Sequence, residues 1–311
     1  MQEKLSVRNC KEALDLTVIH GEDYLSNEVK RAVVSRPGVE IYSNYFDFYE
    51  YNRIQVLGTK EMNLYYMLDK SIRKERIDKL FSYLPPAFIF THNVSEIPSE
   101  FIEASDKYKI PILRSLQTTT TCISALGTYL SEELAVKKSF HGVMMDINGV
   151  GVMLTGKSRI GKSETALQLL KLGHTLISDD RVDIAEPSVG MLVATCPKMI
   201  EKMMEVRGIG LIDVVDLFGV RAFRNKKRLS LIVELKSPEE EKSANRLGTE
   251  EEYETIFSTR VPKVTIYVKP GRNIASLVEV AAYNWRLKSI GKNAALEFTE
   301  RLEKIVKGED N

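Results

Sequence analysis

The sequence predicts an α/β protein with two domains. Its 311 residues exceed the usual length of one domain. Along the first third, short apolar runs alternate with helix-like stretches, which is typical of a largely parallel sheet. In the second half, a glycine-rich turn lies between a strand-like run and a helix-like run, as in nucleotide-binding domains. We place an N-terminal α/β domain at 1–131 and a catalytic domain at 132–311.

The first domain should alternate strands with helices. Strands are expected at 39–42, 54–57, 87–91 and 110–113, and helices at 60–83, 99–108 and 121–135, the last leading into the second domain. No nucleotide-binding glycine pattern or catalytic cluster occurs in this part of the sequence. The sequence therefore assigns the first domain no role.

The second domain should begin with a β-hairpin, because Asn148-Gly149 between apolar runs is the strongest short hairpin signal. Gly173 is placed to end the helix after the glycine-rich turn. The acidic segment 236–253 should be a mobile loop. Strands are expected at 140–147, 150–155, 175–178, 229–235 and 264–268, and helices at 163–172, 274–289 and 293–306.

Residues 156–163, GKSRIGKS, fit the phosphate-binding spacing G-x-x-x-x-G-K-[ST]. The two glycines would let backbone N–H groups turn toward phosphate oxygens, Lys162 would reach the terminal phosphates, and the Ser163 hydroxyl would hold Mg²⁺. The next helix adds the positive end of its dipole. A turn with a solvated lysine is the alternative, and the flanking strand and helix argue against it. The expected nucleotide-binding residues are Gly156, Lys157, Ser158, Arg159, Ile160, Gly161, Lys162 and Ser163.

Two carboxylates follow the strand expected after the phosphate-loop helix. Asp179 and Asp180 lie at its carboxyl end, where ligand sites of α/β proteins gather. One carboxylate could assist the metal while the other accepts a proton from an acceptor hydroxyl. A turn or a helix cap is the structural alternative.

Other polar residues are weaker candidates. Glu205 could complete the metal shell and Arg207 could contact phosphate, or the two could form a surface ion pair. Arg246, in the acidic segment, could neutralise charge in a transition state, as finger arginines do. His141 lies in an apolar strand, where a hydrogen-bonded core histidine is the commoner outcome.

The composition excludes several classes of function. Forty-four basic and 43 acidic side chains leave a net charge of +1, which favours neither nucleic acid nor a membrane surface as a partner. The three cysteines, Cys10, Cys122 and Cys196, lack metal-ligand spacing and suit buried thiols in a reducing compartment. No apolar run approaches the length of a membrane span. We therefore expect a cytoplasmic protein.

The motifs together resemble those of the HPr kinase/phosphorylase family. The run HGVMMDINGVGVMLTGKSRIGKSETALQLLKLGHTLISDDRVDI, residues 141–184, is similar to the family's core signature. EVRGIGLIDV, NRLG and VKPGRNIASLVEVAAYNWRLK resemble its later signatures in the same order. NRIQVLG and IPILRS extend the likeness into the first domain, so it covers nearly the whole chain.

This resemblance implies a bifunctional enzyme, a protein-serine kinase and phosphorylase that takes part in carbon catabolite repression. With Mg²⁺ it would use ATP or pyrophosphate to phosphorylate a serine of HPr, the phosphocarrier of the sugar phosphotransferase system. It would remove that phosphate with inorganic phosphate, yielding pyrophosphate. The active residues it implies are His141, Lys162, Asp180, the proton acceptor, and Arg246; the implied Mg²⁺ ligands are Ser163 and Glu205.

The resemblance also implies an architecture and an assembly. A P-loop kinase domain similar to the nucleotide-binding fold of phosphoenolpyruvate carboxykinase would follow the N-terminal α/β domain. Six copies would form a homohexamer with the P-loop domains at its centre. Segment 204–213 would serve both reactions, and segment 267–272 the dephosphorylation.

The phosphate loop departs from the family's usual GDSGIGKS. Lys157 stands in place of Asp and Arg159 in place of Gly. Arg159 has a Cβ atom and would strain a loop that glycine relaxes, while the two cations would tighten phosphate binding. We expect an unusual donor preference or an unusual balance of the two reactions. Lys269 replaces a usual Arg, which keeps the charge but loses bidentate geometry.

Two other functions fit the phosphate loop alone. One is a small-molecule P-loop kinase, or an enzyme like phosphoenolpyruvate carboxykinase. The other is a non-enzymatic, nucleotide-gated switch; the base-reading motif Asn/Thr-Lys-x-Asp of GTP switches is absent, since 225–228 reads NKKR. Incubation with labelled ATP and HPr would separate these possibilities.

Overall fold

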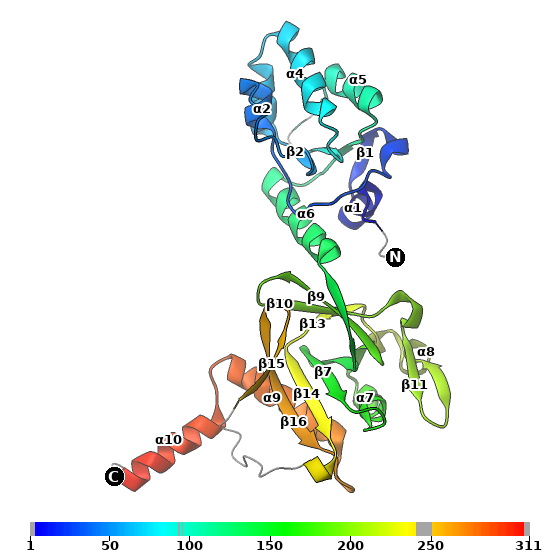
Figure 1. Ribbon diagram of the computed structural model, residues 1–311, viewed down its shortest axis with the longest axis vertical. Helices are drawn as coiled ribbons and strands as arrows, with labels where there is room; N and C mark the ends of the chain where they lie inside the picture. Colours follow the sequence, from blue (N-terminus) through cyan, green and yellow to red (C-terminus); the bar gives the residue numbers. More distant parts are fainter. Residues whose placement is uncertain (1–3, 93, 95, 241–250, 308–311) are drawn as a thin grey trace. The chain divides into compact units, whose positions relative to one another are not determined.

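The protein divides into two compact units, Met1–Ala135 and Val136–Asn311 (Figure 1). The computed structural model describes residues 4–92, 94, 96–240 and 251–307. Within these ranges, no helix is both long enough and apolar enough to cross a lipid bilayer. Each unit has its own sheet and its own core, and each is described separately.

The first unit contains a four-stranded sheet in the order β1-β4-β3-β2. Strands β2, β3 and β4 are parallel, and β1 pairs antiparallel with β4. The largely parallel sheet predicted for this part of the chain is therefore confirmed. The strands are β1 (Thr17–His20), β2 (Gln55–Leu57), β3 (Phe88–Phe90) and β4 (Ile112–Arg114).

Helices cover both faces of this sheet, because alternate residues of each strand point to opposite sides. Phe88 and Phe90 of β3 belong to one buried cluster, and Ile89 belongs to the other. The cluster around Ile89 includes residues of α1 (Val7–Leu14) and α6 (Thr119–Leu134). The cluster around Phe88 includes residues of α2 (Gly38–Ser43), α3 (Thr59–Tyr66), α4 (Lys70–Ser82) and α5 (Ser99–Tyr108).

The strand predicted at 39–42 is wrong, because these residues lie in helix α2. Pro37 precedes the helix, and Asn44 ends it with a left-handed backbone, φ 60°. Ile41 is fully buried, whereas Val39 is 62% exposed. The alternation of apolar and polar residues at 39–42 therefore does not mark the buried face of a strand. It arises in a short helix in which Ile41 is the buried residue of this segment.

The second unit is built on a six-stranded sheet in the order β15-β16-β14-β7-β6-β8. The three strands β16, β14 and β7 are parallel, so their carboxyl ends lie at one edge. Strand β6 is antiparallel to β7 and β8, and β15 is antiparallel to β16. The strands are β6 (Val143–Ile147), β7 (Val150–Gly156), β8 (Thr175–Ser178), β14 (Leu231–Lys236), β15 (Glu252–Ile256) and β16 (Thr259–Tyr267).

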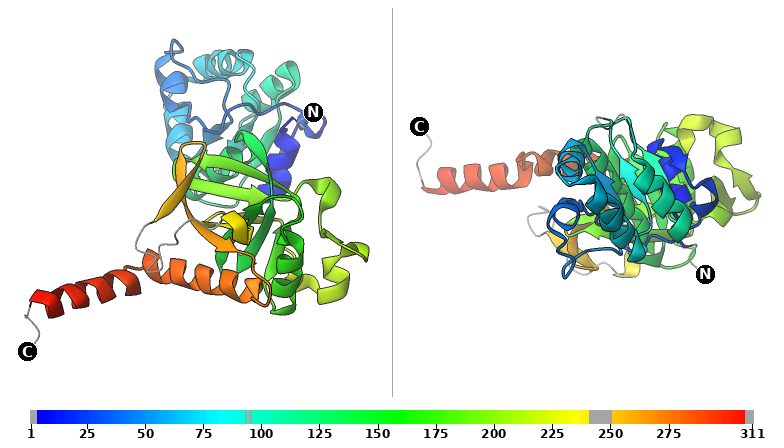
Figure 2. Two further views of the ribbon diagram at one scale, coloured as in Figure 1. Left: turned by 60° about the horizontal axis from the view of Figure 1, so that its bottom comes forward. Right: turned by 90° about the horizontal axis from the view of Figure 1, so that it is seen from above.

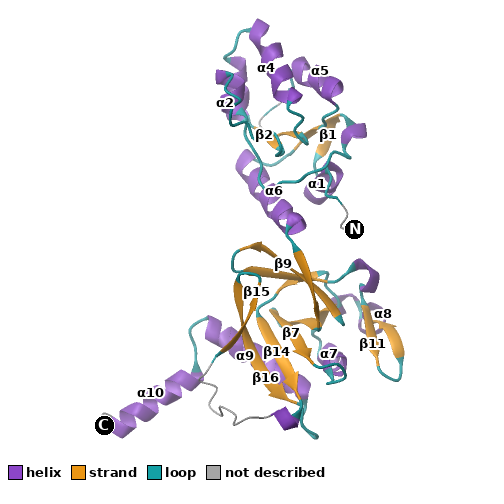
Figure 3. Cartoon of the chain, viewed as in Figure 1, coloured by secondary structure: helices purple, strands orange, loops and turns teal. Residues whose placement is uncertain are grey.

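Other elements cover both faces of the six-stranded sheet (Figure 2 and Figure 3). On one face, Met145 and Val152 belong to a cluster with residues of α7 (Lys162–Lys171) and α9 (Ile274–Ser289). On the other face, Met144 and Met153 pack in a cluster with residues of a second sheet, β13-β10-β9-β5. That sheet consists of β5 (Lys137–His141), β9 (Arg181–Ser188), β10 (Met191–Thr195) and β13 (Lys226–Arg228).

The hairpin predicted at Asn148-Gly149 is confirmed, since it joins β6 to β7. The single strand predicted at 140–147 is wrong, because it divides at Gly142 into β5 and β6, which lie in different sheets. A Cβ atom on Gly142 would lie 2.6 Å from the Leu154 carbonyl oxygen. The absence of a side chain thus allows the chain to pass from one sheet to the other at this point.

The remaining elements lie outside the two sheets of the second unit. They are the hairpin β11 (Met203–Val206) and β12 (Gly210–Asp213), the short helix α8 (Val214–Phe218) and the C-terminal helix α10 (Ala294–Lys307). Of the segment predicted as a mobile loop, residues 241–250 lie outside the described residues. The described ends of that segment form a 3₁₀ turn, Pro238–Glu240, and the start of β15.

Candidate active site

The glycine-rich turn connects the end of β7 to the start of α7, as the spacing predicted. Gly156 ends β7 with φ 131°, and a Cβ atom there would lie 2.3 Å from the Leu235 carbonyl oxygen on β14. Only glycine fits this close approach. Gly161 precedes the helix with φ 103°, which directs the first N–H groups of α7 into the turn. The loop therefore has the backbone form of a phosphate cradle.

Lys162 lies inside this loop and is only 7% exposed. Its Nζ donates hydrogen bonds to the carbonyl oxygens of Gly156, at 3.0 Å, and Lys157, at 3.1 Å. Burial lowers the pKa of the lysine, and the carboxylates of Asp180 and Asp179 oppose that lowering. The ammonium thus lies where phosphate oxygens would compete with the two carbonyls for its hydrogens.

Asp179 connects the phosphate-loop helix to the β11 hairpin. The Ser163 hydroxyl donates to its Oδ1 at 2.9 Å, and the backbone N–H of Glu205 donates to its Oδ2 at 3.1 Å. Asp179 is 4% exposed, and burial raises its pKa against the effect of these hydrogen bonds. A buried carboxylate bonded to the loop serine is the pair that holds Mg²⁺ in P-loop enzymes.

Asp180 has a different environment from its neighbour. Its backbone is left-handed, φ 65°, and its side chain is 77% exposed. The Nδ1 atom of His141 lies 3.0 Å from Asp180 Oδ1. His141, 54% exposed in its side chain, is therefore not the core histidine that its apolar strand favoured. The pairing of β5 with β9 brings the two together, since His141 is opposite Arg181 in the register.

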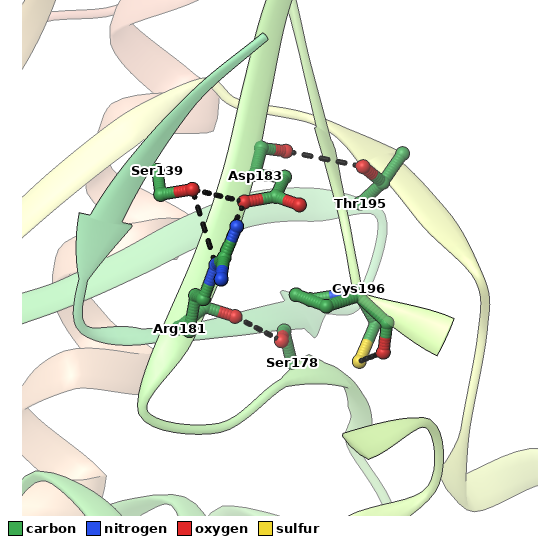
Figure 4. Close-up of polar contacts among 7 residues, drawn as sticks. Ser139, Ser178, Arg181, Asp183, Thr195 and Cys196 are labelled. Carbon is green, nitrogen blue, oxygen red and sulfur yellow. Dashed lines mark hydrogen bonds and ion pairs between the residues drawn. The ribbon is translucent and has the colours of Figure 1, made fainter. Parts of the chain in front are cut away.

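A set of polar contacts holds β5 against β9 next to Asp180 (Figure 4). Arg181 Nε donates to Ser139 Oγ at 3.1 Å and to Asp183 Oδ1 at 3.2 Å, and Ser139 Oγ also donates to Asp183. On the other side of the turn, the Ser178 hydroxyl donates to the Arg181 carbonyl oxygen. The sequence did not single out Ser139, Arg181 or Asp183. The alternation of Arg181 and Asp183 with buried Val182 and Ile184 was the available signal for the β9 pair.

The oxygen donors beside the loop fit Mg²⁺. This ion prefers oxygen ligands, keeps several waters and takes one or two carboxylates together with phosphate oxygens. Ser163 and Asp179 are in contact, and Glu205, whose side chain is exposed on β11, is joined to Asp179 through its backbone. The described residues contain no group of three or more His, Cys, Asp or Glu placed to bind a metal alone. Oxygens of a bound phosphate would have to complete the coordination shell of Mg²⁺.

The other predicted residues are distributed as follows. Glu205 and Arg207 are both exposed, and no ion pair joins them. Lys157 Nζ lies 3.1 Å from Glu240 Oε1. Arg159 has a left-handed backbone, φ 67°, at the position where the strain of a Cβ atom was expected. Arg246 lies outside the described residues.

Two family models match the chain. The model of the HPr Serine kinase C-terminal domain matches residues 132–302, and that of the HPr Serine kinase N terminus matches residues 5–130. The chain belongs to the HPr serine kinase family. The first model alone spans more than half of the protein and includes the phosphate loop, Asp180 and Glu205. The family that the motifs indicated is therefore confirmed.

Curated relatives in this family are similar over nearly the full length. The "HPr kinase/phosphorylase" of Bacillus subtilis (strain 168) is 42% identical over 303 residues, which are 97% of this chain and 97% of that protein. The "HPr kinase/phosphorylase" of Geobacillus kaustophilus (strain HTA426) has the same identity and coverage. A solved structure, the "Hpr(Ser) kinase/phosphatase from Coxiella burnetii", is 35% identical, with a TM-score of 0.48, over 50% of this chain and 93% of that one.

Proposed function

We propose that this protein phosphorylates a serine of the phosphocarrier HPr with ATP or pyrophosphate and removes the phosphate by phosphorolysis. The observation that carries the proposal is the position of Asp180, an exposed carboxylate that contacts His141 at 3.0 Å and directly follows Asp179, which accepts a hydrogen bond from Ser163 of the phosphate loop. The relatives called HPr kinase/phosphorylase, 42% identical along the chain, support the choice of HPr as the substrate.

In the kinase direction, the oxygen of the HPr serine attacks the terminal phosphorus of the donor. The bond between that phosphorus and the leaving ADP or phosphate oxygen breaks, and the serine proton passes to the Asp180 carboxylate. Lys162 and the loop N–H groups offset the negative charge of the transferring group. Bound Mg²⁺, which Ser163, Asp179 and Glu205 would hold, supplies further neutralisation of the phosphates.

In the reverse direction, an oxygen of inorganic phosphate attacks the phosphorus of the phosphoserine. The bond from phosphorus to the serine oxygen breaks, protonated Asp180 returns its proton to that oxygen, and pyrophosphate leaves. Phosphorolysis is the reverse of phosphorylation by pyrophosphate, so these two reactions pass through the same transition state and one carboxylate serves both. Its neighbour Asp179 is buried, and each of its carboxylate oxygens accepts a hydrogen bond. We therefore assign Asp179 a structural and metal-binding role rather than proton transfer.

His141 is a positioning residue in this scheme. With the proton on Nδ1, its ring donates to Asp180 Oδ1 across the observed 3.0 Å. The second oxygen of Asp180 then remains for the serine hydroxyl. The arginine–serine–aspartate contacts of β5 and β9 keep the histidine strand in register with Asp180.

The exposure of Asp180 favours a protein substrate over a small molecule. The side chains of Asp180 and His141 are 77% and 54% exposed, so a serine on the surface of another protein could reach them. A small-molecule kinase encloses its acceptor and excludes water around it. The accessible carboxylate therefore favours HPr among the alternatives left by the phosphate loop.

The decisive experiment is incubation of the protein with HPr, Mg²⁺ and either ATP or pyrophosphate. Mass spectrometry should find one phosphoserine on HPr with each donor. Addition of excess inorganic phosphate should then remove it and release pyrophosphate. If HPr gains no phosphate from either donor, the proposal is wrong.

We also propose that the protein forms a homohexamer and that it lies in the cytoplasm. Arg246 would contribute positive charge that offsets the negative charge of the transferring phosphate. Exposed apolar side chains on α9 and α10 support self-association. They include Val280, Leu287, Phe298 and Leu302. Light scattering at micromolar concentration would measure the number of subunits.

Replacing Arg159 by glycine should relax the loop and weaken pyrophosphate binding. The left-handed backbone costs a non-glycine residue about 1 kcal/mol, so the free energy of unfolding should rise slightly. Loss of an exposed cation should raise the KM for pyrophosphate by about fivefold, corresponding to about 1 kcal/mol. Lys157→Ser is the control, because it removes a neighbouring charge without changing a left-handed position. An unchanged KM in Arg159→Gly would show that this arginine does not contribute to donor binding.

A further inference from the structure

An ion pair joins the phosphate loop to the turn that follows β14. Lys157 Nζ lies 3.1 Å from Glu240 Oε1, and the two side chains are 77% and 33% exposed. Strand β14 leads to Glu240, and it runs parallel to β7 with Leu235 opposite Gly156, where the loop begins. A carboxylate therefore lies beside a loop whose expected ligands are anions.

Local hydrogen bonds hold the Glu240 carboxylate in this place. Its Oε1 accepts from the Ser237 hydroxyl at 3.0 Å and from the Ser237 backbone N–H at 3.4 Å. The backbone N–H of Glu240 donates to the Ser237 carbonyl oxygen at 3.1 Å across the 3₁₀ turn. These contacts do not involve Lys157, so the carboxylate would stay beside the loop without the lysine. The hydrogen bond from Lys157 is the largest cause that lowers the pKa of Glu240, which favours its ionised form.

The cations of the loop differ in their surroundings. Lys162 is buried and donates to two loop carbonyls, while Arg159 is exposed and forms no ion pair with any described residue. Lys157, in contrast, already has a carboxylate as its partner. An ammonium paired with Glu240 attracts phosphate less than a free one does, and the carboxylate itself repels phosphate. The tightening of phosphate binding that the sequence suggested for Lys157 is therefore offset by Glu240.

We propose that Glu240 lowers the affinity of the phosphate loop for pyrophosphate by engaging Lys157. This rests on the proposed function, in which pyrophosphate is both a donor and the product of phosphorolysis. The carboxylate weakens the binding of inorganic phosphate less, because a ligand with fewer charges interacts less with a fixed charge. Glu240 contacts Lys157 rather than the reacting atoms, so it is a positioning residue that sets how tightly the loop holds pyrophosphate.

The test is the variant Glu240→Gln, whose side-chain amide oxygen can still accept from Ser237 but has no charge. With Mg²⁺ present, the Kd for pyrophosphate in calorimetry should fall by about threefold, the scale of an exposed ion pair, and the Kd for inorganic phosphate should fall less. Loss of a purely structural contact would raise both values instead. Glu239→Gln is the matched control, because Glu239 is exposed in the same turn and forms no ion pair with a described residue. That control should change neither value.

The same substitution in a Lys157→Ser background shows whether the effect depends on the lysine. The gain in pyrophosphate affinity should be smaller there, because no ammonium is released when the carboxylate is lost. Calorimetry needs no HPr, so this comparison decides the inference even if HPr is never phosphorylated and the proposed function fails. Weaker or unchanged binding of pyrophosphate by Glu240→Gln, or an equal gain in both backgrounds, would overturn the inference.

Discussion

Replacing Asp180 by asparagine is expected to abolish both phosphorylation and dephosphorylation of HPr. The asparagine keeps the shape of the side chain but cannot accept the serine proton in one direction or return it in the other. Loss of a general base or acid lowers the rate by about 10²- to 10⁴-fold. The measurement is the initial rate of phosphoserine formation with ATP and of its loss with phosphate. ADP binding by calorimetry should remain, because Asp180 does not belong to the loop.

The matched control is Asp216→Asn, on an exposed position of α8. This change should leave both rates unaltered. His141→Gln should give an intermediate result, lowering kcat and shifting its pH profile while the KM for ATP stays constant. Turnover of the Asp180→Asn variant at the wild-type rate in either direction would exclude Asp180 as the group that transfers the proton.

Where both ends of an element carried a local signal, the sequence located that element to the residue. Helix α5 was predicted at 99–108, helix α9 at 274–289 and strand β8 at 175–178, and the structure has the same bounds. Asn273 precedes α9, and its side chain accepts from the backbone N–H of Ser276. Pro98 precedes α5 and makes no side-chain hydrogen bond, but its fixed φ suits the start of a helix. Such caps depend on residues next to the helix and need no tertiary partner.

The strands between Arg181 and Arg228 were not predicted, because their stability comes from partners distant in the sequence. Strand β9 contains Pro187, which argues against a strand in a sequence taken alone. Strand β13 reads Lys-Lys-Arg, and the middle side chain, Lys227, forms an ion pair at 2.8 Å with buried Asp146. No local pattern of three cations predicts a strand, so this part of the second sheet required the structure.

The two aspartates of the site show what spacing cannot decide. Asp179 and Asp180 are adjacent, so their spacing left the two roles interchangeable, and only the family resemblance named Asp180 as the proton acceptor. Burial separates them: Asp179 is 4% exposed and accepts from Glu205, which is 26 residues away, whereas Asp180 is exposed beside His141. The pairing of β5 with β9 and the position of the β11 hairpin produce this difference. Neither was predicted from the sequence.

Replacing Lys162 by methionine should weaken the binding of both phosphoryl donors. Methionine fills a similar volume but has no hydrogens to donate, so a charge-assisted contact to the phosphates is lost at a cost of about 1.5–3 kcal/mol. The Kd for ADP and the Kd for pyrophosphate should each rise by about 10- to 100-fold in calorimetry.

Lys137→Met, on an exposed position of β5, is the control for the removal of one positive charge. Lys162 is also a hydrogen-bond donor to the carbonyl oxygens of Gly156 and Lys157, so its loss could distort the empty loop rather than remove a ligand contact. Thermal unfolding distinguishes the two causes. An unchanged melting temperature with weaker binding assigns the loss to the phosphate contact. If the Kd for ADP and the Kd for pyrophosphate were both unchanged, the loop amides and the metal would hold the phosphates without this lysine.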